Sequence, residues 1–328
     1  MTVPWGIAVD RDAGRAAPVV RDRPAVGRQD FQATRVRCRT VSDDAVTRFD
    51  VPLLDDSSAI GVIRDAVREQ RPFSMIRVND GEAVALAFGA QMWLDDVSYL
   101  RSHWGGEFVT IEAIEEVRDD LWDAIAGADL VGVRPDIVGV PMPADLTQRR
   151  GDDVRAFVRD SLPLRPHERD VLTVPSARRI ALLQQALAPY EPVDQLWCSC
   201  WLHWELLAAG VLDDMLGEVE RGGIVTPRAE LATVIGQRFD IEVDVVVVPD
   251  KFVEANAAGA HVPNFYRTMP DRLNFSPGTL VLVGAGIPGK AYCNWLKQRG
   301  CVAVDIGAVF DAWVGKASRP RVLESRFG

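Results

Sequence analysis

The sequence lacks several features that define whole classes of protein. Its 328 residues contain no apolar run near the roughly 20 residues that cross a bilayer. The first residues, MTVPWGIAVD, lack the basic start and apolar stretch of a secretory signal. The five cysteines are an odd number without a CxxC pair, so neither a disulfide framework nor a zinc site is indicated. These absences favour a cytoplasmic protein with reduced thiols and no transmembrane segment.

Basic side chains are also too few for a protein that binds mainly nucleic acid. The chain has 37 Lys and Arg against 47 Asp and Glu, a net charge of −10. That balance disfavours nucleic acid or an anionic membrane as the main partner. Hydrophobic residues make up 48% and charged residues 26%, as in an ordinary globular protein. The composition is compatible with a homodimer.

The order of apolar segments predicts an α/β fold. Residues 1–48 are rich in Arg, Asp, Pro and Gly without apolar periodicity, which indicates a mobile or loosely packed arm before a folded region at 49–328. In that region, buried strand-like runs such as FSMIRV and TLVLV alternate with helical patterns. Such alternation is typical of βαβ units, so we expect a mostly parallel sheet flanked by helices.

The most conspicuous motif follows the strand-like run TLVLV. Gly284, Gly286 and Gly289 match G-x-G-x-x-G at the start of a helix, and Asp305 ends the next strand 21 positions after the first glycine. This spacing is close to that of the acidic residue that binds ribose in dinucleotide folds, so an NAD(P)-dependent oxidoreductase is one interpretation. However, only about 40 residues remain after the first glycine, too few for the second half of a dinucleotide site.

The same glycine turn permits three other interpretations. Residues 284–290 also fit G-x-x-x-x-G-K, but Ala291 stands where a P-loop needs a hydroxyl, which argues against an NTPase. The turn can serve packing alone. Alternatively, the turn and Lys290 can lie against a donor phosphate, because the N–H groups and dipole of a helix N-terminus favour anions.

A second motif, RVNDGE at residues 77–82, ends a predicted strand at the sheet edge where open α/β folds bind ligands. The carboxylates of Asp80 and Glu82, separated by one glycine, can turn toward one hard cation such as Mg²⁺ or Mn²⁺. Arg77 adds positive charge nearby. The alternative is helix capping, with Asp80 as the cap and Glu82 favoured in the first turn by the helix dipole.

Other candidate residues are less specific. His203 lies among large apolar residues, where a lone histidine is more often structural than catalytic. His103 and Trp104 precede two glycines and can stack on a base or sugar. Asp311 follows the last strand and is a candidate on the acceptor side. If the reaction inverts the anomeric centre, Glu82, His203 and Asp311 are the candidate bases, and the sequence does not choose among them.

These segments together resemble the GT-D-type glycosyltransferase family, formerly described as a domain of unknown function. SMIRVNDGEAVAL is similar to that family's strand and Asp-x-Glu (DXE) turn, and WLHWELLAAGVLDDML is similar to a helical segment that carries a histidine. LVLVGAGIPGKAYCNWLKQRGCVAVDIGAVFDAW is similar to its closing strand, glycine turn, helix and Asp-Ile-Gly strand. The resemblance covers about residues 55–315. It departs at Ala308, where many relatives have a histidine.

The resemblance implies a single Rossmann-like domain at 49–328 and a glycosyltransferase of the hexosyltransferase type. The donor would be a nucleotide sugar of the UDP-sugar class, and the acceptor a hydroxyl on a glycan or small molecule. Mn²⁺ or Mg²⁺ would be bound by Asp80 and Glu82. The donor side would include Arg77, Asp80, Gly284, Gly286, Gly289, Lys290 and Asp305. A non-catalytic nucleotide-sugar-binding protein remains an alternative. We expect both motifs to line one cleft, because parallel strands end at the same edge of a sheet.

Overall fold

The structure is a computed structural model that describes residues 46–89, 94–192, 194–250 and 260–315. The expected N-terminal arm, residues 1–48, therefore lies almost entirely outside the described residues. Its last residues form the short strand β1 (Val46–Thr47), which pairs antiparallel with β4 (Met142–Pro143).

The core of the fold is a seven-stranded sheet in the order β5-β3-β2-β9-β8-β6-β7, in which every neighbouring pair is parallel. The strands are β2 (Phe73–Val78), β3 (Leu130–Val133), β5 (Leu196–Ser199), β6 (Arg221–Thr226), β7 (Glu242–Val247), β8 (Leu280–Val283) and β9 (Val302–Asp305). The Rossmann-like α/β fold with a parallel sheet is confirmed. The edge strand β5 was not predicted, because LWCS is short and lacks a run of β-branched residues.

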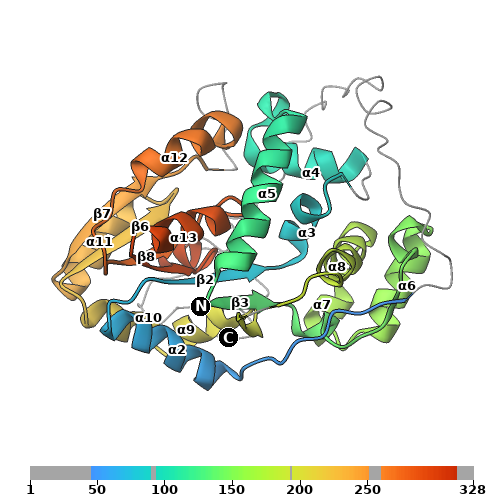
Figure 1. Cartoon of the computed structure of the whole chain (residues 1–328), viewed down its shortest axis with the longest axis horizontal. Coiled ribbons are helices and arrows are strands. Elements are labelled where there is room, and N and C mark those ends of the chain that lie inside the picture. The colour runs from blue at the N-terminus through green and yellow to red at the C-terminus, as the bar shows by residue number, and fades with distance from the viewer. Residues whose placement is uncertain (1–45, 90–93, 193, 251–259, 316–328) are drawn as a thin grey trace.

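Helices cover both faces of this sheet (Figure 1). On one face, a single core cluster contains buried side chains from α3 (Asp80–Leu86), α4 (Leu94–Trp104), α5 (Ile111–Gly127), α6 (Gly151–Ser161), α8 (Val174–Leu187), α12 (Tyr266–Arg272) and α13 (Gly289–Gln298). The other is covered by α2 (Asp56–Arg68), α9 (Leu202–Ala208), α10 (Val211–Gly217), α11 (Glu230–Phe239) and α14 (Val309–Trp313). The remaining short segments are α7 (Pro166–Asp170), η1 (Gly106–Phe108), η2 (Pro135–Ile137), η3 (Leu146–Gln148) and η4 (His261–Phe265).

Strand β8 shows why its sequence is apolar without alternation. Leu280 and Leu282 pack with the helices of one face, whereas Val281 and Val283 pack with those of the other. Successive strand side chains point to opposite faces, so a strand covered on both sides needs apolar residues throughout. Each such side chain contributes roughly 1.5–3 kcal/mol when fully buried. Within the described ranges, no helix has the length and apolar character that a bilayer crossing requires.

Local signals account for some helix boundaries. Asp55 caps α2 by accepting a hydrogen bond from the Ser58 backbone N–H at 2.7 Å. The segment WLHWELLAAGVLDDML, residues 201–216, has the composition of one continuous helix but forms two. Gly210, with φ of +69°, separates α9 from α10, because glycine adopts this left-handed conformation without steric cost.

Candidate active site

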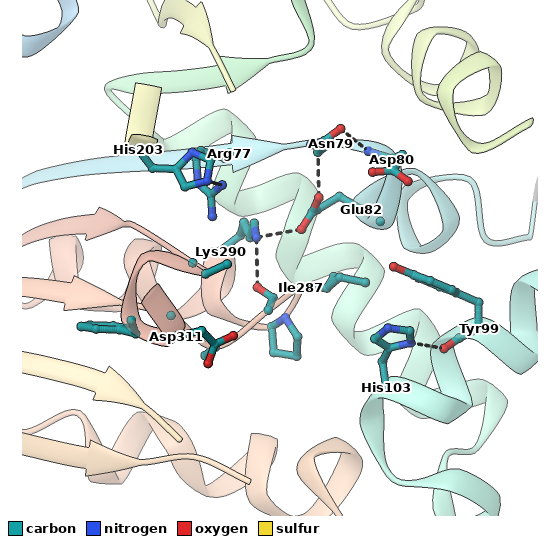
Figure 2. Close-up of a pocket in the computed structure, with 18 of the residues that line it drawn as sticks. Arg77, Asn79, Asp80, Glu82, Tyr99, His103, His203, Ile287, Lys290 and Asp311 are labelled. Carbon is teal, nitrogen blue, oxygen red and sulfur yellow. Dashed lines mark hydrogen bonds and ion pairs between the residues drawn. The ribbon is translucent and has the colours of Figure 1, made fainter. Parts of the chain in front are cut away.

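A pocket of about 560 Å³ opens at the carboxyl edge of the sheet. Its walls come from the segments that follow β2, β3, β5, β6, β8 and β9. Asp80 and Glu82 share this pocket with the glycine turn at Gly284 and Gly286, so the expectation of one cleft is confirmed (Figure 2). Parallel strands bring these distant segments together, because all of them end at the same edge.

The Asn79-Asp80-Gly81-Glu82 segment forms the first turn of α3. Asn79 is the N-cap, and its side-chain oxygen accepts a hydrogen bond from the Asp80 N–H at 2.8 Å. Glu82 completes a capping box, because its Oε2 accepts from the Asn79 N–H at 2.9 Å. The capping hypothesis is therefore right for this turn but wrong in naming Asp80 as the cap.

The two carboxylates of this turn have different partners. Residues two apart on a helix do not face each other. Asp80 Oδ2 lies 3.3 Å from Arg179 Nε, whereas Glu82 Oε1 lies 2.7 Å from Lys290 Nζ. The side chain of Asp80 is 31% exposed and that of Glu82 only 8%. Asp80 is thus the carboxylate that solvent and ligands reach more readily.

Four ionised groups, three of which line the pocket, form a network of buried ion pairs. Lys290 Nζ lies 2.7 Å from Glu82 and 3.2 Å from Asp305 Oδ2, and it donates to the Gly286 carbonyl oxygen at 3.0 Å. Arg77 Nη2 pairs with Asp305 Oδ1 at 2.9 Å. Burial alone would raise the pKa of Asp305, but these two cations hold it below its ordinary value. Conversely, burial alone would lower the pKa of Lys290, and the carboxylates hold it above its ordinary value.

His203 fixes the position of Arg77. The guanidinium always donates, so His203 Nε2 accepts from Arg77 Nη1 at 2.9 Å, and Nδ1 therefore carries the hydrogen that it donates to the Cys200 carbonyl oxygen at 3.0 Å. Both ring nitrogens are thereby used within the protein. Arg77 also donates through Nε to the Asp305 carbonyl oxygen at 3.0 Å. This geometry makes His203 a positioning residue for the guanidinium.

The glycine turn is shaped by close packing as well as by backbone conformation. A Cβ on Gly284 would overlap the ring of Phe310 and lie 2.9 Å from the Gly307 carbonyl oxygen. Gly286 has φ of +66°. The Gly289 N–H donates to the Gly286 carbonyl oxygen at 3.2 Å, and the Lys290 N–H donates to that of Ile287 at 3.3 Å. The packing interpretation therefore applies to the first glycine, and two amides of the helix start are already used.

Three arginines of the pocket were missed in the sequence. Arg134 follows β3 directly and Arg228 lies two positions after β6, so their places near strand ends were an available signal, whereas Arg179 lies within α8 and carried none. Arg134 pairs with Asp136 at 2.6 Å and Glu168 at 3.0 Å.

Arg228 holds the candidate base Asp311 in place. Its Nε and Nη2 both contact Asp311 Oδ1, at 2.9 and 2.8 Å, and its Nη1 pairs with Asp250. Oδ2 is therefore the Asp311 oxygen not held by Arg228. The Asp311 side chain is 16% exposed and lines the pocket.

The charged side chains that line the pocket balance one another. Its cationic side chains, taken over the described residues, are Arg77, Arg134, Arg179, Arg228 and Lys290. Its carboxylates are Asp80, Glu82, Glu168, Asp250 and Asp311, and Asp136 and Asp305 pair with the same cations from behind. The five positive and five negative lining groups sum to zero with neutral histidines, and Asp136 and Asp305 further offset the charges of Arg134 and Arg77. Each of the five cations already has a carboxylate partner.

Aromatic and histidine side chains form the remaining wall. Trp104 and His103 line the pocket, as their place before two glycines suggested, and the His103 ring lies 4.2 Å from that of Tyr99. His261, which the sequence analysis missed, is buried with Nε2 2.7 Å from the Tyr292 hydroxyl, and burial lowers the pKa of His261 to about 4. This wall can pack against a nucleobase or sugar.

A divalent cation fits this donor set through oxygen ligands. Within the ranges that the structure describes, no three His, Cys, Asp or Glu side chains converge on one point. Mg²⁺ and Mn²⁺ sites often use only one or two carboxylates and complete their shell with water and substrate phosphates. Asp80 faces the pocket and fits such a site, whereas Glu82 Oε1 is held by Lys290.

Comparison with known proteins identifies part of the chain. No curated protein matches it. Two solved structures are similar, both with a TM-score of 0.45. One is a selenomethionine-substituted structure of domain of unknown function 1792, with 12% identity over 77% of this chain and 78% of that chain. The other is described as showing that this highly conserved domain has a distinct glycosyltransferase fold, with 13% identity over 79% of this chain and 84% of that chain. The family model of the GT-D fold-like domain matches residues 54–150. Residues 54–150 are therefore similar to a GT-D fold-like domain, and β2, Asp80 and Glu82 lie within this match.

Proposed function

We propose that this protein is a metal-dependent glycosyltransferase that moves a sugar from a nucleotide-sugar donor, a UDP-sugar, to a hydroxyl acceptor. The GT-D fold-like match contains the Asp-Gly-Glu segment and supports the assignment. The observation that carries the metal dependence is that each basic side chain described in the pocket is already paired with a carboxylate. An anionic diphosphate needs additional positive charge to bind there.

Asp80 is the residue that would hold the cation in the free protein, with Glu82 as a second ligand once Lys290 moves. Oxygen ligands suit Mn²⁺ and Mg²⁺. A divalent ion bound at Asp80 would neutralise the charge that develops on the leaving diphosphate. Arg77 supports the same charge from a fixed position, because three hydrogen bonds hold its guanidinium before the donor arrives.

Asp311 is the base that the geometry supports best for an inverting transfer. The acceptor hydroxyl oxygen would form a bond to the anomeric carbon while the bond to the diphosphate oxygen breaks, and its electron pair would leave with the nucleotide. The proton of the hydroxyl would pass to Asp311 Oδ2. Glu82 and His203 fit this role less well, since both carboxylate oxygens of the first and both ring nitrogens of the second are used within the protein.

The oxidoreductase alternative is poorly supported by the same geometry. An NAD(P) site built on the glycine turn would use Asp305 to bind a ribose hydroxyl. Asp305 is 1% exposed, and its carboxylate contacts Arg77 and Lys290 instead. A binding protein without catalysis differs from an enzyme only in turnover, so that alternative is decided by a sugar-transfer assay.

Ligand-dependent stabilisation tests the proposal. Thermal unfolding would be followed with UDP, GDP, TDP and NAD⁺, each with Mn²⁺, with Mg²⁺ and with chelator, because a ligand that binds the folded state raises the melting temperature. We expect UDP to stabilise the protein far more with metal than with chelator. Equal stabilisation by UDP in both conditions would refute the metal dependence, and stabilisation by NAD⁺ alone would favour the oxidoreductase.

Asp80→Asn tests the metal role at the residue itself. The substitution keeps the size of the side chain and leaves the cap, which Asn79 provides, in place. We expect near-native melting, weaker Mn²⁺-dependent UDP binding and a loss of turnover of several orders of magnitude, if the metal supplies several kcal/mol to the transition state. A folded Asp80→Asn protein with wild-type turnover would show that this carboxylate does not hold a catalytic metal.

A further inference from the structure

The ammonium group of Lys290 lies against the Glu82 carboxylate oxygen that a metal ion would otherwise be able to reach. Its ammonium lies 2.7 Å from Glu82 Oε1, 3.2 Å from Asp305 Oδ2 and 3.0 Å from the Gly286 carbonyl oxygen. Figure 2 shows it between the start of α3 and the glycine turn. The other oxygen of Glu82 is fixed by the Asn79 N–H. In this arrangement a cation of the protein itself neutralises the second carboxylate of the Asp-Gly-Glu motif.

The partners of Lys290 would not be affected equally by its departure. Asp305 would keep its ion pair with Arg77 at 2.9 Å. Glu82, which is only 8% exposed at its side chain, would retain one N–H donor and the more distant charge of Arg77, and it would lose its ion pair. A buried carboxylate without a counter-charge is costly, so Lys290 can leave only when another cation takes its place. In turn, a buried ammonium that leaves a carboxylate needs a new anion.

From this geometry we infer that Lys290 exchanges partners when the donor binds, passing from Glu82 to the diphosphate while Glu82 becomes a ligand of the divalent ion. The inference rests on the proposed function. If the metal bound alone, the ammonium of Lys290 would repel it at Glu82. If the nucleotide bound alone and drew Lys290 away, Glu82 would lose its counter-charge. Metal and nucleotide therefore bind cooperatively, and Lys290 is the residue that couples them. The flexible side chain of lysine allows the ammonium group to move. Because Lys290 lines the pocket, a bound diphosphate would be within its reach.

Metal affinity, measured without any turnover, tests this coupling. Free Mn²⁺ would be followed by electron paramagnetic resonance during titration of the protein, with and without UDP. In the wild-type protein we expect UDP to raise Mn²⁺ affinity by a factor of roughly 5–150, the usual range for coupled sites. In Lys290→Met we expect Mn²⁺ to bind without UDP roughly tenfold more tightly than in the wild type, because Glu82 is released.

A matched double variant separates ligand release from a simple change of charge. Removing Lys290 takes one positive charge from the pocket, which by itself favours a cation. In Lys290→Met with Glu82→Gln, the gain should disappear if it depended on Glu82, and it should persist if it came from charge alone. Circular dichroism and urea unfolding would check the folding of each variant.

The outcomes distinguish this inference from the proposed function. Wild-type protein that binds Mn²⁺ equally well with and without UDP overturns the exchange even if no variant folds. A gain that persists in the double variant overturns it as well. Failure of the wild type to bind UDP under any metal condition would overturn the proposed function together with the inference, whereas cooperative binding that Lys290→Met leaves unchanged would overturn the exchange alone.

Discussion

Glu82 and Asp80 are two positions apart, yet the structure predicts that neutralising them has very different effects on stability. Glu82→Gln keeps an oxygen that accepts from the Asn79 N–H but places an amide where Oε1 meets Lys290 at 2.7 Å. The buried network of Lys290, Arg77, Asp305 and Glu82 then carries an uncompensated positive charge. Breaking a buried pair by removing one partner typically costs about 3–5 kcal/mol.

Asp80→Asn removes a more exposed partner. Its contact with Arg179 is 3.3 Å long, and the carboxylate is 31% exposed, so the ion pair contributes at most about 1 kcal/mol. The loss of one negative charge from the first turn of α3 adds a few tenths of a kcal/mol to about 1 kcal/mol. We therefore expect Glu82→Gln to lose several times more unfolding free energy than Asp80→Asn.

Urea unfolding at pH 7 measures both values, provided that the slope m is unchanged. A double-mutant cycle with Lys290→Met provides the control, because the two substitutions together remove one charge of each sign. The pair should be less destabilised than the sum of the single variants. If Glu82→Gln lies within about 1 kcal/mol of the wild type, or if the cycle shows simple additivity, the buried network does not stabilise the protein as described.

Three further predictions concern other parts of the site. Asp311→Asn should lower kcat by a factor of roughly 10²–10⁴ if Asp311 is the general base. Asp250→Asn alters the other carboxylate that Arg228 holds and should leave kcat largely unchanged. Steady-state sugar-transfer kinetics of the two variants measure this difference. Gly284→Ala should lower the unfolding free energy, measured in urea, by about 1–3 kcal/mol or more, because its Cβ would overlap Phe310 and Gly307. Gly61→Ala in α2, where a Cβ meets nothing within 4 Å, should instead stabilise the protein by up to about 1 kcal/mol. An equal effect of both substitutions would contradict the packing role of Gly284. The pKa of His261 is near 6.5 in the unfolded chain and about 4 in the folded protein, so between these values the unfolded chain binds the extra proton. Wild-type stability therefore decreases as the pH is lowered from about 6.5 to about 4, by up to roughly 3 kcal/mol. The difference in unfolding free energy between wild type and His261→Gln should narrow from pH 7 to pH 4, and a constant difference would contradict the buried neutral histidine.

Much of the fold could be predicted because its signals are local. The run at β8 is apolar throughout and the run at β2 is mostly apolar, as expected for strands covered on both faces, and both were found within a residue or two. The glycine turn and the Asp-Gly-Glu segment were placed at strand ends, and that was enough to predict their shared cleft. Strand β5 was missed because its four residues owe their conformation to pairing with β3, not to their own propensity.

The partners of the ionised groups were decided by tertiary structure alone. By itself, the sequence determined the α/β fold, the two motifs and the edge of the sheet where they meet, since periodicity and turn chemistry act over a few residues. It did not show that Lys290 neutralises Glu82, that His203 holds Arg77, or that Arg228 holds Asp311. These pairs join residues from 83 to 208 positions apart along the chain. Which charges meet depends on how the parallel strands are ordered, and in a buried site those pairings determine which carboxylate can receive a metal or a proton.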